Sequence, residues 1–209
     1  MINIFAEANC NRYVRDECQY CHVYEPLSQI PKSHWHLMPE QAQIMVDKIL
    51  RLEVFHELAK REINLTGGEP SQNPHIVEIF KIFRKLTPNV RIHTNLDINS
   101  EKSQRWQRLV EIMKFSGRVD FTLYPTVWES RQKPLLIKIL GLQKELIVNM
   151  IFEKVSDLLS QIETLITFFG EREKKFQSIL SLLGIYRAKL ESLLGENPEC
   201  SERAFLKHM

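Results

Sequence analysis

Residues 63–70 read Ile63-Asn64-Leu65-Thr66-Gly67-Gly68-Glu69-Pro70, a short alternating apolar run that ends in two glycines, a glutamate and a proline. Alternation of apolar and polar residues is typical of a β-strand. Paired glycines allow a tight turn and a close approach of the backbone to a ligand, and Pro70 stiffens the exit. The segment therefore predicts a strand that ends in a loop able to carry a functional group.

Similar apolar runs recur along the chain. They begin near Val90, Val119 and Leu146, with a weaker one near Phe176, at intervals of 27 to 30 residues from Ile63 onward. An interval of that length accommodates a strand, a turn, a helix and a return loop. A further strand, Ile2–Phe5, is expected to come first. The rhythm predicts an α/β fold built from repeated βα units on a parallel sheet.

The segments between these runs carry apolar residues at helical spacing. Asn73 is the expected N-cap of one helix, with Pro74 at its first position, and Pro39 is expected to open another. The predicted apolar stripes are Ala42, Met45, Val46, Ile49 and Leu50; Ile76, Ile79, Phe80 and Phe83; Trp106, Leu109, Val110 and Met113; and Val155, Leu158, Leu159, Ile162, Leu165 and Ile166. Residues 176–194 fit either a sixth βα unit or one helix. We therefore predict one domain over residues 1–195 and a tail over 196–209.

The composition and charge of the chain argue against a nucleic-acid binder and a membrane protein. The chain has 209 residues, and 28 Lys and Arg against 26 Asp and Glu give a net charge of +2, far from the basic excess of a dedicated nucleic-acid binder. We see neither a leader segment at the start nor an apolar run of the ~18 residues that a membrane span needs. We expect a soluble cytoplasmic protein without nucleic-acid or membrane partners. In a reducing compartment, its four cysteines favour metal or redox chemistry over disulfides.

Three of the cysteines stand close together after the first expected strand. Cys10, Cys18 and Cys21 lie within Cys-Asn-Arg-Tyr-Val-Arg-Asp-Glu-Cys-Gln-Tyr-Cys-His. Thiolates hold iron-sulfur clusters, and three ligands on a four-iron cluster would leave one iron open to another molecule. This loop and Gly67–Glu69 both follow a strand, and parallel α/β proteins bind ligands at the carboxyl ends of their strands. The Glu69 carboxylate could accept hydrogen bonds from an ammonium group.

Two other metal sites fit part of the pattern. Cys18-Gln-Tyr-Cys21-His22 satisfies the rule for covalent c-type haem attachment, but we see no export signal with it. Cys18 and Cys21 followed by His34 and His36 suggest zinc, although one residue between the histidines is shorter than the usual finger spacing. Cys200 is expected to be a spare thiol in the tail.

The cysteine cluster and the Gly-Gly-Glu-Pro turn together resemble the radical S-adenosylmethionine (SAM) superfamily, over roughly Ile2 to Phe152. The resemblance implies a partial (β/α)6 barrel, and whether it is truncated at its C-terminal end stays open. It also implies a [4Fe-4S] cluster that binds SAM and cleaves it reductively to methionine and a 5'-deoxyadenosyl radical, which abstracts a substrate hydrogen. The seven residues between Cys10 and Cys18 exceed the three usual in the family, which changes the cluster loop.

Matching the motifs position by position implies a set of site residues. The cluster ligands would be Cys10, Cys18 and Cys21, Tyr20 would lie near the adenine, and Gly67, Gly68 and Glu69 would receive the methionyl amino group. Asn95 resembles a polar position near SAM, and Thr122, Tyr124 and Asn149 are weaker matches for ribose or carboxylate contacts. We interpret His93 as a satisfied interior histidine and not as a base.

The expected function is hydrogen abstraction from a peptide, protein or small-molecule substrate that the motifs do not specify. An electron donor such as flavodoxin or ferredoxin is expected as a partner. The alternatives are a non-enzymatic zinc- or iron-sulfur-binding module and an inactive relative of the fold.

Overall fold

The computed structural model of the chain describes residues 2–10, 31, 34–142, 145–150 and 155–170. Its contacts form two compact units, Met1–Asn149 and Met150–Met209. The strands are β1 (Ile2–Glu7), β2 (Ile63–Gly67), β3 (Val90–Thr94), β4 (Arg118–Leu123) and β5 (Glu145–Met150). The helices are α2 (Pro39–Arg51), α3 (Glu53–Arg61), α4 (Ile76–Phe83), α5 (Gln104–Met113), α6 (Lys133–Gly141) and α7 (Val155–Gly170). Single turns η3 (Pro70–Gln72), η4 (Pro125–Val127) and η5 (Trp128–Gln132) complete them.

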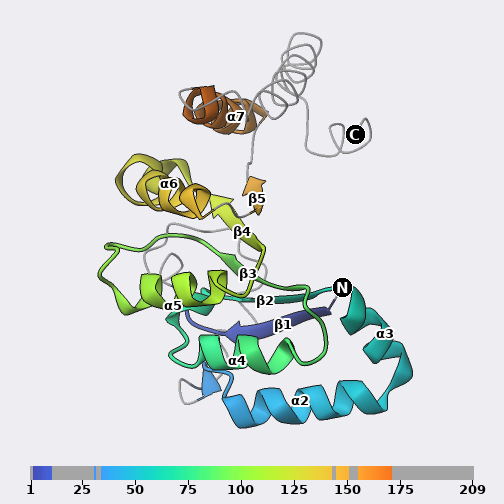
Figure 1. The fold of residues 1–209 in the computed structure, drawn as a ribbon. Coiled ribbons are helices and arrows are strands. Elements are labelled where there is room, and N and C mark those ends of the chain that lie inside the picture. Colours follow the sequence, from blue (N-terminus) through green and yellow to red (C-terminus); the bar gives the residue numbers. More distant parts are fainter. Residues whose placement is uncertain (1, 11–30, 32–33, 143–144, 151–154, 171–209) are drawn as a thin grey trace. The chain divides into compact units, whose positions relative to one another are not determined.

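The five strands form one parallel sheet in the order β1-β2-β3-β4-β5 (Figure 1). Ile63 of β2 lies opposite both Ile2 of β1 and Val90 of β3. Each strand therefore pairs with the one that precedes it in the chain. The α/β class and all five strands predicted from the apolar runs up to residue 150 are confirmed. The run near Phe176 and the expected domain boundary at residue 195 lie outside the described residues.

The two faces of the sheet differ in polarity. The register, with the alternation of side chains along each strand, assigns Ile4, Leu65, Ile92 and Phe121 to one face and Asn64, Arg91, His93, Asp120 and Thr122 to the other. The residues of the first face are almost completely buried, and α2 and α4 lie together on one side of β1 and β2 (Figure 1). A parallel sheet covered by helices on both faces is apolar on both. The polar face therefore distinguishes this sheet from parallel sheets that helices cover on both sides.

The predicted helical stripes are confirmed with local corrections. The stripe of α4 is fully buried. In α2, Ala42, Val46 and Ile49 are buried, whereas Met45 and Leu50 at the margins of the stripe are 36% and 50% exposed. In α5 and α7, the predicted positions Val110, Leu159 and Ile166 are only half-buried.

The predicted start of α4 is wrong by two residues. The helix begins at Ile76 with His75 as its N-cap. Asn73 is used earlier, because its Oδ1 accepts a hydrogen bond from the His75 amide at 2.8 Å in the turn after η3. Its Nδ2 donates to the carbonyl oxygens of Ala6 and Leu37. The side chain therefore ties the turn to β1 and to the segment before α2.

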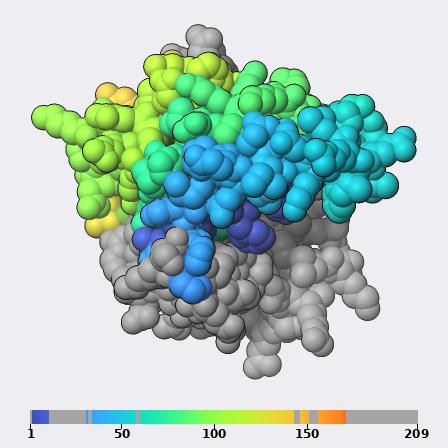
Figure 2. All heavy atoms as spheres, turned by 90° about the horizontal axis from the view of Figure 1, so that it is seen from below, coloured from blue at the N-terminus to red at the C-terminus, as the bar shows by residue number. Residues whose placement is uncertain are grey.

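The helices α2 and α3 lie at the molecular surface (Figure 2). Their exposed apolar residues include Ile44, Val54 and Phe55, and Leu52 between the two helices is also exposed. Among the helices of the described ranges, none has both the length and the apolar content that crossing a bilayer requires.

Candidate functional site

The Gly67-Gly68 turn packs directly on the chain that leads to Cys10. Gly67 has a φ of +126°, and a Cβ atom there would lie 2.2 Å from the carbonyl oxygen of Glu7. A Cβ atom at Gly68 would lie 2.3 Å from the carbonyl oxygen of Asn9. The amide of Gly68 donates to Glu7 O at 2.7 Å, and the next amide donates to Asn9 O at 2.8 Å. The glycines allow a close approach to the protein's own backbone, and the predicted close approach to a ligand stays a prediction.

The Glu69 carboxylate is completely buried and joins β2 to the end of β3. Its Oε1 accepts hydrogen bonds from the Ser71 amide at 3.0 Å and from Thr94 Oγ1 at 2.9 Å. Its Oε2 accepts from the Asn95 amide at 2.7 Å, and Arg105 Nη2 lies 3.8 Å from Oε1. An ionised carboxylate has about four acceptor positions. The described residues use three of them, and the contact of Glu69 with a ligand ammonium stays a prediction.

Cys10 and Asn95 meet beside this carboxylate. Cys10 is buried, and Asn95 Nδ2 lies 3.9 Å from its Sγ, within the reach of a hydrogen bond to sulfur. The Asn95 Oδ1 atom accepts from the Asp97 amide at 2.9 Å, which fixes the amide plane. The structure therefore brings together Cys10, Glu69 and Asn95, from three separate parts of the sequence. The other predicted ligands and the predicted adenine contact, Cys18, Cys21 and Tyr20, lie outside the described residues.

Gln132 forms hydrogen bonds next to Asn95, and the sequence did not predict it as a site residue. The side chain is fully buried in the π-helical turn η5. Its Nε2 donates to the carbonyl oxygens of Asn95 and Thr122, both at 2.7 Å, and its Oε1 accepts from the Tyr124 amide at 2.9 Å. Gln132 therefore connects the carboxyl ends of β3 and β4. A single glutamine in a polar stretch gives no sequence signal of such a role.

The weaker site candidates lie along β4 and β5. Thr122 Oγ1 is 2.9 Å from His93 Nε2, and Asn149 Nδ2 donates to Phe121 O at 3.4 Å. Tyr124 is half-buried. Burial lowers the pKa of His93, with the charge of Glu69 opposing that effect. Our interpretation of His93 as a satisfied histidine agrees with this hydrogen bond.

Glu7 is a second buried carboxylate that the sequence analysis missed. Its side chain is inaccessible to solvent, and its Oε2 lies 2.5 Å from Nδ1 of His36, which is 41% exposed. Its Oε1 accepts from the Asn9 amide at 2.7 Å. The backbone of His36 forms an antiparallel bridge with Glu7. One of the two histidines considered for zinc is therefore in contact with a carboxylate at the end of β1.

The buried Glu7 should make stability depend on pH. Burial raises the pKa of Glu7, although the hydrogen bonds from Asn9 and His36 counteract it. The folded protein therefore holds a proton that the unfolded chain releases above about pH 4.3. This contribution to stability is full below that pH and is lost as the pH rises through the folded-state pKa.

Glu7→Gln should flatten that part of the pH profile, measured as the free energy of urea unfolding across a pH series. Glu57→Gln is the matched control, because Glu57 is exposed and Lys60 lowers its pKa. Its loss should affect the profile slightly and with the opposite sign. Identical profiles for the wild type and Glu7→Gln would contradict the prediction.

No protein-family model, curated protein or solved structure matches the chain. Within the described ranges, no group of three or more His, Cys, Asp or Glu side chains is placed to hold a metal ion. Of the predicted cluster ligands, only Cys10 belongs to those ranges.

Proposed function

We propose that this protein is a radical SAM enzyme, with a [4Fe-4S] cluster on Cys10, Cys18 and Cys21. The observation that carries the proposal is the contact between the loop entering Cys10 and the Gly67-Gly68 turn, at the carboxyl ends of β1 and β2. The chain that leads to Cys10 and the Gly67-Gly68 turn thus meet at the carboxyl ends of parallel strands, the end at which parallel α/β proteins bind ligands.

The sheet supports a partial (β/α)6 barrel as the finer description of the fold. In doubly wound sheets the strand order reverses at a switch point, whereas each strand here pairs with its predecessor. A barrel wall has that order. The polar face with Asn64, Arg91 and Asp120 is suited to an interior that holds a polar ligand.

The chemistry of Cys10 and its neighbour Asn95 supports an iron-sulfur cluster as the bound group. A thiolate at Cys10 would ligate iron, and the Asn95 amide, 3.9 Å from Sγ, would donate to the ligating sulfur. Hydrogen bonds to sulfur are among the determinants of cluster potential. When bound, the cluster and SAM would supply reductive cleavage and a carbon radical, with an electron from a donor such as flavodoxin or ferredoxin.

The protein's own contribution would be positioning and enclosure. Glu69 and Gln132 fix the ends of β2, β3 and β4 through buried hydrogen bonds. Such fixed polar groups orient a bound ligand and limit the access of water. Contacts of Tyr20, Thr122, Tyr124 and Asn149 with SAM belong to the same proposal, and the substrate would be a peptide, a protein or a small molecule.

Anaerobic purification tests the proposal. We expect a brown protein with about four irons and four sulfides per chain, which forms 5'-deoxyadenosine from SAM under dithionite. Cys10→Ala should lose both the cluster and the cleavage activity. Cys200→Ala, outside the predicted ligand set, should retain both.

Two other outcomes would contradict the proposal. A colourless zinc protein that does not cleave SAM would support the metal-binding module. An intact cluster and full cleavage in Cys10→Ala would refute the ligand assignment.

A further inference from the structure

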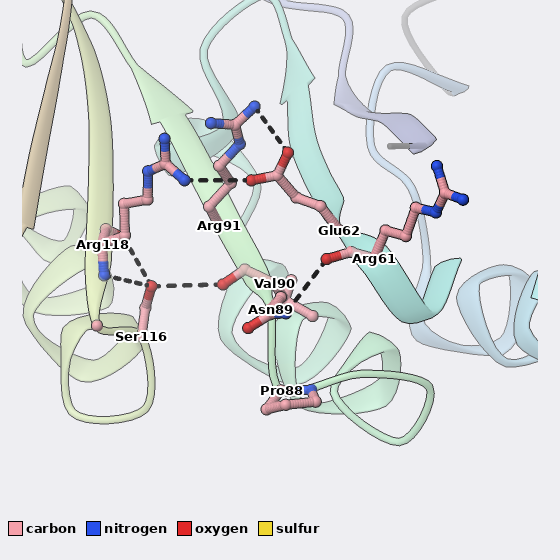
Figure 3. Close-up of a pocket in the computed structure, with 9 residues that line it drawn as sticks. Arg61, Glu62, Pro88, Asn89, Val90, Arg91, Ser116 and Arg118 are labelled. Carbon is pink, nitrogen blue, oxygen red and sulfur yellow. Dashed lines mark hydrogen bonds and ion pairs between the residues drawn. The ribbon is translucent and has the colours of Figure 1, made fainter. Parts of the chain in front are cut away.

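A cavity of about 350 Å³ lies at the amino ends of β2, β3 and β4 (Figure 3). Residues that precede or begin these strands line it, among them Glu62, Arg91 and Arg118. Cys10 and Glu69 follow the carboxyl ends of their strands. The cavity is therefore at the other end of the sheet from the site proposed for SAM, and its function can be considered separately.

One carboxylate in the cavity is shared by two arginines. Glu62 Oε2 lies 3.2 Å from Arg91 Nη2, and Glu62 Oε1 lies 3.4 Å from Arg118 Nη1. Arg91 has a second, closer ion pair with Asp120 at 2.8 Å. In Figure 3 the guanidinium groups of Arg91 and Arg118 each face one oxygen of Glu62, whereas that of Arg61 points away from them. Arg91 therefore forms the closer ion pair with each carboxylate, and Glu62 and Asp120 both lie farther from Arg118.

Arg118 forms ion pairs with the two carboxylates Glu62 and Asp120, but its guanidinium keeps N–H groups that they do not use. Its side chain is 35% exposed, and its Nε lies 3.7 Å from Asp120, beyond hydrogen-bond distance. Within the described part of the chain, this buried Nε atom has no acceptor. Among the described residues, its guanidinium forms one hydrogen bond, the long contact of 3.4 Å with Glu62. Because a guanidinium has five N–H groups and this side chain is partly exposed, the terminal nitrogens of Arg118 can take a further acceptor from solution.

Hydrogen bonds from neighbouring loops hold the backbone at Arg118. Ser116 Oγ donates to the carbonyl oxygen of Arg118 at 2.6 Å and accepts from its amide. It also lies 3.3 Å from the carbonyl oxygen of Val90. Asn89 Nδ2 donates to the carbonyl oxygen of Arg61. These bonds connect the loops before β2, β3 and β4 and hold the Arg118 backbone in place.

We propose that this cavity binds a small soluble ligand through a phosphate or carboxylate group held by Arg118. A planar guanidinium matches the oxygen spacing of both groups, and the cavity volume is in the range of small-molecule sites. Glu62 repels such a ligand and competes for the same donors. The site therefore has one residue whose removal weakens binding and one whose removal strengthens it.

Isothermal titration calorimetry of the full chain with inorganic phosphate and with citrate tests the proposal. We expect saturable binding of at least one probe, and about tenfold weaker binding in Arg118→Gln. Glu62→Gln should bind more tightly than the wild type. Arg51→Gln, which removes an exposed arginine of α2 outside the cavity, should leave the affinity unchanged. Circular dichroism melting curves verify that each variant is folded.

The two probes show which oxyanion the cavity prefers. Binding of phosphate alone would indicate a phosphate ligand, and binding of citrate alone would indicate a carboxylate ligand. Absence of saturable binding of both probes to the wild type would overturn the proposal. So would equal affinities of the wild type and Arg118→Gln, or weaker binding in Glu62→Gln. These outcomes do not depend on whether the protein carries a cluster.

Discussion

Gly67→Ala should lower the free energy of unfolding by about 2–5 kcal/mol. Two effects combine, because alanine is strained at a φ of +126° and its Cβ would lie 2.2 Å from the backbone oxygen of Glu7. A backbone atom cannot move aside as the end of a flexible side chain can. Relief of the clash would require the end of β1 to shift, and Cys10 follows three residues later.

Urea unfolding of the variant measures the loss of stability, and iron content after anaerobic reconstitution reports on the cysteine loop. Gly141→Ala is the matched control, because a Cβ atom at that position meets nothing within 4 Å. Its unfolding free energy should stay within about 1 kcal/mol of the wild type. A Gly67→Ala variant as stable as this control would show that the turn does not pack on the end of β1.

Glu69→Gln should lower the free energy of unfolding by about 2–4 kcal/mol, the range for breaking buried hydrogen bonds to a charged group. Every hydrogen bond that the described residues make to this carboxylate comes from a donor in the protein: the amides of Ser71 and Asn95 and the hydroxyl of Thr94. The amide nitrogen of a glutamine would bring a donor against one of these donors. Arg105, 3.8 Å away, would also lose its ion pair with Glu69.

The comparison with Glu78→Gln separates this effect from a change in net charge, because Glu78 is exposed on α4. That control should unfold within about 0.5 kcal/mol of the wild type. Amide hydrogen exchange should show weaker protection at Asn95 in Glu69→Gln only. Equal stability of the two variants would mean that Glu69 does not hold β2 and β3 together.

The sequence alone was sufficient for the features that depend on local periodicity. Ile63 and Val90 begin strands because apolar residues alternate from those positions, and Ile76 and Ile79 are buried because their helical spacing gives α4 one apolar face. The same approach failed at Asn73, whose residue type favours an N-cap. Its side chain bonds instead with a turn amide and with β1, a choice made by distant neighbours.

The chain by itself determined the parallel α/β class, the positions of the five strands and the candidates Cys10, Glu69 and Asn95, because these follow from periodicity and residue type. Only the tertiary structure decided that Gly67 packs on Glu7, that Gln132 joins β3 to β4, and that Arg118 faces a cavity. Such contacts connect residues far apart in the chain, as from Asn95 to Gln132. They form only when strand register brings those residues together, and register depends on the packing of the whole sheet.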